Sequence, residues 1–370
     1  MMKFHILKES PQKLSTAILS VNVGWAHEPM GLKGISHFLE HAIFLGNEEY
    51  KEPDIDVGVY GVTLDGETLE ERTIFFFNSL EKDMDEILRV LLSLVFNPSF
   101  DDKKVEEEKI SKILPAVVKE EDYYPWELAY EWARNLVFSW DFRCSMGVKE
   151  EIKRMGVADL YKWHRKYYKS ENSILILSSE PNLDIEVQDG GEAPVFQKIN
   201  HGKNKVILNR SIENAEIVYG FPYHHYDLRV HLLSTILGNY PTSILWKEFC
   251  KRAYMVDARA EWHNSRGGFF IYIGANSKDV EKIRREFQSF WENLKIKKED
   301  VEIAKKILNL EMLQKDRSPY RFIHLLKIDP LLKFGGFGDI CEAIRDISVE
   351  DMKDFLNSLD LNDLIETVVK

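Results

Sequence analysis

The feature of this sequence that most constrains its fold is an internal repeat. Residues 73–109 read as an apolar strand, a Lys-Asp helix start, an amphipathic helix, a short turn and a second charged helix. Residues 269–306 repeat that order 196 positions later, and a second pair of matching segments, beginning at Glu150 and Glu342, recurs after 192 positions. Because a repeat at a nearly fixed spacing marks a duplicated structural unit, the sequence predicts two homologous halves.

Each half mixes alternating strands with helices of ten residues or more, as in "AILSVNVGW" and "SILILSS" among helical segments. This pattern predicts an α+β fold with two homologous domains, each an antiparallel-rich sheet with helices packed on one face. The 370 residues suit two domains of roughly 185 residues each. Gly, Pro, Asn and charged residues accumulate over residues 182–205, so we expect the domains to cover residues 1–185 and 200–370.

Composition restricts the partners and the compartment. The chain is 44% hydrophobic and 30% charged, and 49 basic against 61 acidic side chains give a net charge of −12. This acidic balance argues against nucleic acid or an anionic membrane as a partner. The cysteines, Cys144, Cys250 and Cys341, are odd in number and lack C-x-x-C spacing, and no run of eighteen apolar residues or apolar leader is present. We therefore expect a cytoplasmic protein.

One short motif carries recognisable chemistry. The stretch "GISHFLEHAIFLG", residues 34–46, contains His37, Glu40 and His41 in the spacing H-x-x-E-H. On a helix the two imidazoles at i and i+4 project from one face, with the carboxylate beside them. Two neutral imidazoles can bind one zinc ion, and a neighbouring carboxylate can take a proton from a metal-bound water. A pair of hydrogen-bonded core histidines is the alternative for such a motif in isolation.

The residues around this motif carry a family resemblance. At these positions the chain resembles the inverzincin metallopeptidases, the family of pitrilysin, insulin-degrading enzyme and mitochondrial processing peptidase. It is similar to the short, two-domain, bacterial-like members of that family. Farther on, "GVTLDGETLEERTIFFF" is similar to a strand pair of that family, with Thr68 and Thr73 retained and Asp65 where the family has asparagine. The matching positions around the motif are Gly24, Glu28, Gly34, His37, Phe38, Leu39, Glu40, His41, Phe44 and Gly46.

The resemblance implies a zinc peptidase in which His37 and His41 bind Zn²⁺ and Glu40 activates a water that attacks the scissile carbonyl. It also implies peptides or unfolded polypeptides as substrates, bound in extended form along an exposed sheet edge within a closing chamber. Asp65 and Thr68 are expected near that edge. Short two-domain chains of this family act as dimers, so a homodimer, or a heterodimer with a related chain, is the expected partner arrangement.

The sequence departs from the family at the third metal ligand. The family supplies that ligand from the second of two glutamates that are seven residues apart. The first of these two glutamates corresponds here to Glu108. Counting seven residues onward reaches Pro115, whose side chain has no donor atom, and a slip of one residue gives Leu114 or Ala116. Either Glu108 itself or Glu120 therefore stands as the candidate third ligand, and whether zinc occupies the site stays open.

A second departure lies in the other half. The family places an arginine and a tyrosine seven residues apart to steady the substrate, and counting from "SILW" puts Cys250 and Asp257 at those positions. A thiol is a weak donor and an aspartate repels an oxyanion. Two hypotheses follow: a zinc-dependent peptidase of the inverzincin type, or a catalytically degenerate member that serves as a non-catalytic subunit or peptide-binding scaffold.

Overall fold

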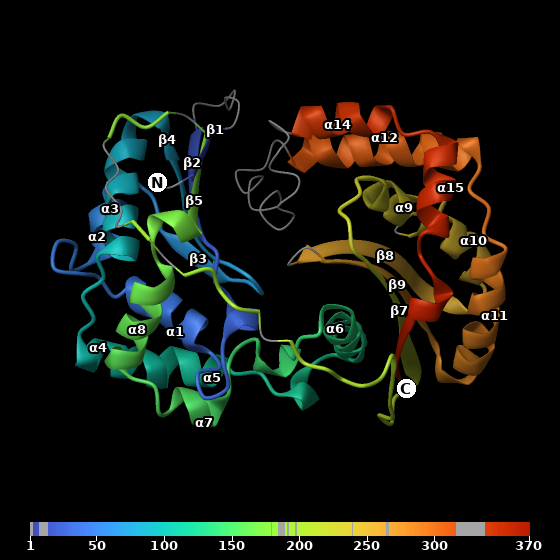
Figure 1. Ribbon diagram of the computed structural model, residues 1–370, viewed down its shortest axis with the longest axis horizontal. Helices are drawn as coiled ribbons and strands as arrows, with labels where there is room; N and C mark the ends of the chain where they lie inside the picture. The colour runs from blue at the N-terminus through green and yellow to red at the C-terminus, as the bar shows by residue number, and fades with distance from the viewer. Residues whose placement is uncertain are drawn as a thin grey trace. The chain divides into compact units, whose positions relative to one another are not determined.

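A computed structural model describes most of the chain, which forms two compact units (Figure 1). The first unit holds the described parts of Met1–Lys119 and Arg143–Gln197, and the second those of Glu120–Phe142, Lys198–Ser318 and Leu325–Lys370. The described residues are 3–6, 14–178, 180–183, 189–190, 192–196, 198–238, 240–263, 266–315 and 337–370.

The first unit is built on a five-stranded sheet with the order β1-β5-β2-β4-β3. β1 runs parallel to β5, and every other neighbouring pair is antiparallel. β2 is buried along almost its whole length because it lies in the middle of the sheet, whereas β3 is the outermost strand. The strands are β1 (Lys3–Ile6), β2 (Leu14–Val21), β3 (Asp65–Thr68), β4 (Thr73–Leu80) and β5 (Ser173–Leu177).

Helices of the first unit cover this sheet. α3 packs against β2 and β4, and α1 packs against β3 and β4. The helices are α1 (Ile35–Ile43), α2 (Pro53–Gly58), α3 (Met84–Phe96), α4 (Asp102–Glu108), α5 (Leu114–Ala116), α7 (Lys149–Ile152) and α8 (Val157–Tyr167).

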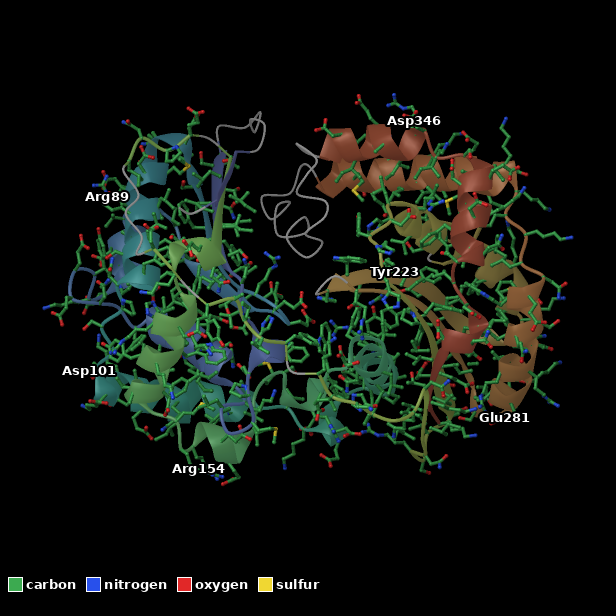
Figure 2. All side chains as sticks on the ribbon, in the orientation of Figure 1. Arg89, Asp101, Arg154, Tyr223, Glu281 and Asp346 are labelled. Carbon is green, nitrogen blue, oxygen red and sulfur yellow. The ribbon has the colours of Figure 1, made fainter. Side chains whose placement is uncertain are left out.

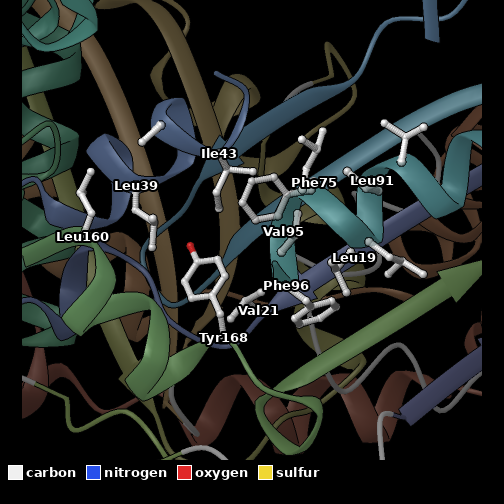
Figure 3. Close-up of a cluster of buried hydrophobic side chains, with 14 of the residues drawn as sticks. Leu19, Val21, Leu39, Ile43, Phe75, Leu91, Val95, Phe96, Leu160 and Tyr168 are labelled. Atoms are coloured by element: carbon white, nitrogen blue, oxygen red, sulfur yellow. The ribbon is translucent and has the colours of Figure 1, made fainter. Parts of the chain in front are cut away.

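Apolar side chains from the sheet and these helices form the core of the first unit (Figure 3). Phe75 of β4, Leu39 and Ile43 of α1, and Tyr168, just after α8, are buried in this cluster. Charged side chains such as those of Arg89 in α3 and Asp101, just before α4, point outward into solvent (Figure 2). Burial of the apolar face of α1 is thus what holds this helix against the sheet.

The second unit repeats the topology of the first. Its sheet has the order β6-β10-β7-β9-β8, with β6 parallel to β10 and the other neighbouring pairs antiparallel. The predicted α+β fold with two homologous halves is therefore confirmed. The strands are β6 (Lys205–Leu208), β7 (Asn214–Tyr223), β8 (Ala253–His263), β9 (Arg266–Asn276) and β10 (Ile365–Val369).

Helices lie on both faces of this second sheet. The predicted packing of helices on one face of each sheet is therefore wrong for this unit, because α6, from the first half of the sequence, packs on β7 and β10. The Tyr219 ring of β7 stacks on Phe287 of α11, while the next residue, Gly220, faces Val137 of α6. Since successive strand residues point to opposite faces, α6 and α11 cover opposite sides. The helices are α6 (Pro125–Phe138), α9 (Arg229–Leu237), α10 (Ile244–Phe249), α11 (Val280–Glu292), α12 (Lys298–Lys315), α14 (Phe337–Arg345) and α15 (Val349–Asn357).

α6 precedes β5 in sequence and yet belongs to the second unit. The units defined by spatial contacts therefore do not follow a simple cut of the sequence. The domain bounds 1–185 and 200–370 stay a prediction. No helix within the described ranges is long and apolar enough to cross a membrane.

Candidate metal centre

The helix that carries the H-x-x-E-H motif is fixed by the spacing of its apolar residues. Ile35, Phe38, Leu39, Ala42 and Ile43 are all buried, so one face of α1 packs into the core. The helix begins after Gly34, which has φ 102°, a left-handed conformation that glycine adopts without strain. A Cβ atom at this position would also lie 2.9 Å from the Gly147 Cα atom. Only glycine therefore fits at the start of this helix.

His37 and His41 lie next to each other on α1, as their spacing predicts. Their ring centroids are 4.8 Å apart and their planes are perpendicular. Burial, with a smaller contribution from the nearby His41, lowers the pKa of His37 to about 4. His37 is therefore neutral at pH 7, which is the form that binds metals. Its Nδ1 atom is buried and has no hydrogen-bond partner among the described residues.

Glu108, at the end of α4, holds the second histidine. Its Oε1 atom lies 2.8 Å from His41 Nδ1, and the two side chains are 16% and 29% exposed. A carboxylate at Nδ1 favours the tautomer with the proton on that nitrogen, so the Nε2 lone pair is left for a ligand. This arrangement is the one in which a carboxylate orients a metal-binding histidine.

Glu40 is buried between α1 and the edge strand β3. Thr68 Oγ1 donates a hydrogen bond of 2.6 Å to Glu40 Oε2. Gly66 of β3 passes so close that a Cβ atom there would lie 3.1 Å from Glu40 Oε1 and 2.9 Å from the Phe44 ring. Burial raises the pKa of Glu40, and the hydrogen bond from Thr68 opposes that rise. A buried carboxylate with a raised pKa suits a group that accepts and returns a proton.

The other predicted site residues have distinct positions. Asp65 is exposed at the start of β3, where its Oδ1 atom accepts a hydrogen bond from Gly66 N at 2.9 Å. Glu120 belongs to the second unit, where its carboxylate accepts a hydrogen bond from Trp132 Nε1 at 3.3 Å. The structure thus brings Glu108 and Thr68 to the motif, and it gives Glu120 a different partner.

A π-helical turn, Lys109–Ile113, separates α4 from α5. Such a turn holds one residue more than an α-helical turn, so the position two turns beyond Glu108 falls at Ala116 rather than at Pro115. Neither side chain has a metal-binding atom. Within the part of the chain that the structure describes, no three His, Cys, Asp or Glu side chains form a group able to hold a metal ion.

In the second unit, the positions that correspond to the family's substrate-steadying pair serve other roles. Cys250 is exposed at the end of α10. Asp257 is buried and accepts a hydrogen bond from Arg259 Nε at 2.6 Å. The nearby Tyr254 donates to Glu216 at 2.6 Å. These contacts fix the Asp257 and Tyr254 side chains within the second unit.

Glu28 matches the family pattern, but the sequence alone assigns no role to its side chain. Its two carboxylate oxygens accept hydrogen bonds from Gly34 N and Ser36 N, both at 2.7 Å. Burial raises the pKa of Glu28 to about 7, although these two hydrogen bonds oppose the rise. The signals that the sequence offers for Glu28 are its match to the family pattern and its position a few residues before a glycine that starts a helix, and both are weak.

Two family models match the chain. Residues 4–128 match the model described as insulinase (peptidase family M16), and residues 154–308 match the model described as the peptidase M16 inactive domain. An uncharacterized zinc protease of Rickettsia bellii is 23% identical, covering 96% of this chain and 90% of the relative. Cytochrome b-c1 complex subunit 1 of Rattus norvegicus is 23% identical over 45% of this chain and 35% of its own length.

A solved structure supports the fold. The crystal structure of a protease from Helicobacter pylori superposes with a TM-score of 0.79 at 17% sequence identity, covering 97% of this chain and 94% of that one. At this level of identity, the similarity establishes the shared architecture.

Proposed function

Since this chain belongs to peptidase family M16, the insulinase family, we propose that it is a zinc-dependent peptidase that hydrolyses peptide bonds in peptides or unstructured polypeptides. The observation that carries this proposal is the environment of Glu40. This carboxylate lies between two histidines on one helix, is buried, and receives a hydrogen bond from Thr68 on the edge strand. A carboxylate in such a place is ready to take a proton from a water next to it.

His37 and His41 are the residues that would hold the zinc ion. The neutral ring of His37, its unpartnered buried Nδ1 atom and the Glu108 contact on His41 fit two imidazole ligands. Among the described residues no third His, Cys, Asp or Glu side chain groups with these two histidines to hold a metal ion, whereas catalytic zinc sites have three protein ligands. Bound zinc supplies a Lewis acid that polarises the carbonyl and acidifies a water.

The remaining steps belong to the side chains of this chain. Glu40 accepts the proton of the attacking water and returns it to the leaving amine. Thr68 keeps the Glu40 carboxylate in place through its 2.6 Å hydrogen bond. An extended peptide pairs with the outer edge of β3, next to Asp65 and Thr68, through main-chain hydrogen bonds. Such pairing selects unfolded substrates rather than a fixed sequence.

A non-catalytic role is the second candidate. It is supported by the missing third ligand, with Pro115 or Ala116 at the relevant place, and by Cys250 and Asp257 at the positions of the substrate-steadying pair. In that case the chain would serve as a peptide-binding scaffold or as the partner of a related subunit. Assembly into a homodimer or heterodimer, and a cytoplasmic location, stay predictions from the sequence.

The test is cleavage of an unstructured polypeptide, such as casein, by the zinc-supplemented protein and by the Glu40→Gln variant. Glutamine keeps the size of the side chain but cannot accept the proton, so we expect activity to fall by roughly a hundredfold or more. Glu107→Gln, an exposed change on α4, is the matched control and should leave activity intact. Equal cleavage by wild type and Glu40→Gln would refute the mechanism, and binding of casein without cleavage would favour the scaffold.

A further inference from the structure

The loop before α1 is anchored to the turn that follows the edge strand β3. Trp25 N donates to Leu69 O at 3.1 Å, and Ala26 N donates to Glu70 O at 2.8 Å. Gly24 lies so close that a Cβ atom would be 2.2 Å from Leu69 O. This loop is therefore held rigidly against the β3–β4 turn, because both backbone pairing and close packing fix it.

Glu28 extends from this anchored loop to the start of α1. One carboxylate oxygen accepts from Gly34 N and the other from Ser36 N, each at 2.7 Å, and the residue is fully buried. Gly34 has no side chain with which to cap the helix. Glu28 thus supplies from outside the helix the acceptor that its first turn needs.

The hydrogen bond from Ser36 N to Glu28 connects Glu28 to the H-x-x-E-H motif. Ser36 precedes His37, so the position of the Ser36 amide sets the position of the turn that presents the His37 ring. At the other end of the same arrangement, Thr68 of β3 holds Glu40. Glu28 and Thr68 therefore tie α1 to the same β3–β4 hairpin at two separate points.

The burial of Glu28 adds a second line of support. Desolvation raises its pKa to about 7, which means that the fold keeps a carboxylate where its charge is unfavourable. Groups kept at such a cost are concentrated at functional sites. An apolar residue or a polar cap within the helix would have been less costly if only helix stability were needed.

We propose that Glu28 is a positioning residue, which sets the first turn of α1 so that His37 and His41 face one metal ion next to Glu40. It contacts neither metal nor substrate, and it acts through the backbone of Gly34 and Ser36. The inference rests on the proposed function only for the roles of His37, Glu40 and His41 in zinc binding and peptide hydrolysis.

The experiment compares Glu28→Gln and Glu28→Asp with wild type in two measurements. Glutamine offers one acceptor and turns an N–H group toward an amide that needs an acceptor, while aspartate is one methylene too short to reach both amides. Asp159→Asn is the matched control, because Asp159 accepts from Gly156 N at 3.0 Å and caps α8 in the same unit.

The first measurement is amide hydrogen exchange over residues 34–41 in metal-free protein. We expect exchange to rise roughly tenfold or more in both Glu28 variants, the factor for loss of one charge-assisted hydrogen bond, and to stay unchanged in Asp159→Asn. The second is Zn²⁺ affinity by competition with a chromophoric chelator, where we expect a tenfold to hundredfold loss for Glu28→Gln and Glu28→Asp and no loss for Asp159→Asn.

These outcomes separate the two proposals. Zn²⁺ affinity of folded Glu28→Gln within about twofold of wild type would overturn the positioning role. If wild type binds no Zn²⁺, the proposed peptidase function fails, and the exchange measurement alone decides: unchanged exchange over residues 34–41 then rejects the inference, and raised exchange sustains it. Should Glu28→Gln fail to fold, Glu28→Asp provides the same comparison.

Discussion

Replacing Glu108 by glutamine tests how the second metal-binding histidine is held. Glu108→Gln keeps the length of the side chain, but it replaces a charged acceptor by a neutral amide at His41 Nδ1, 2.8 Å away. The preference for the tautomer that leaves Nε2 to the metal is then weaker.

The expected magnitude follows from the geometry. The contact is short and the Glu108 side chain is only 16% exposed, so water screens it poorly, whereas its 3.7 Å approach to the exposed Lys112 contributes little. Loss of a carboxylate behind a metal-binding histidine weakens metal binding by about tenfold to a hundredfold, equivalent to about 1.4 to 2.7 kcal/mol.

The assay is Zn²⁺ titration of metal-free protein in competition with a chelator, with Glu107→Gln as the control. Glu107 is the adjacent glutamate, its side chain is 67% exposed, and it forms an ion pair with Lys103 at 3.7 Å. Glu107→Gln should bind Zn²⁺ as wild type does. Unchanged affinity in Glu108→Gln would refute the orienting role of Glu108, and a loss beyond about a thousandfold would mean that Glu108 is itself a ligand.

Two further changes test the packing around the site and the buried histidines. Gly66→Ala places a Cβ atom 2.9 Å from the Phe44 ring and 3.1 Å from Glu40 Oε1, so we expect a loss of about 1 to 3 kcal/mol in urea unfolding and reduced peptidase activity; wild-type stability would contradict this packing. Burial lowers the pKa of His164 to about 4, so its stabilising contribution is complete above pH 6.5 and is lost as pH falls toward 4. His164→Gln should therefore lose about 3 kcal/mol less than wild type between pH 6.5 and 4 in urea unfolding, and equal losses would show that His164 does not titrate in this range.

The repeat in the sequence predicted the fold because topology follows from the order of elements. Residues 73–109 and 269–306 both became a strand, a helix and a second helix, within sheets of the same strand order. The position of α6 could not be predicted in this way. Its apolar residues indicate that one face is buried, but they do not indicate which of the two sheets covers that face.

The candidate site divides in the same way. The spacing of His37, Glu40 and His41 follows from helix geometry and needs no tertiary information. The contact between Glu108 and His41 spans 67 residues, and the π-helical turn changes which residue follows Glu108 by two turns. No local sequence pattern encodes the Glu108–His41 contact or the π-helical turn, because both depend on how α4 packs against α1.

The path of α6 has a consequence for synthesis on the ribosome. Its buried face packs on β7 and β10, and Thr367 of β10 donates a hydrogen bond to Ala129 O across 238 residues of sequence. At roughly 5 to 20 residues per second, α6 leaves the ribosome about 10 to 50 s before its final strand partner exists. During that interval the nascent chain exposes the apolar face of this helix, and such a surface is prone to aggregation until β10 has been made.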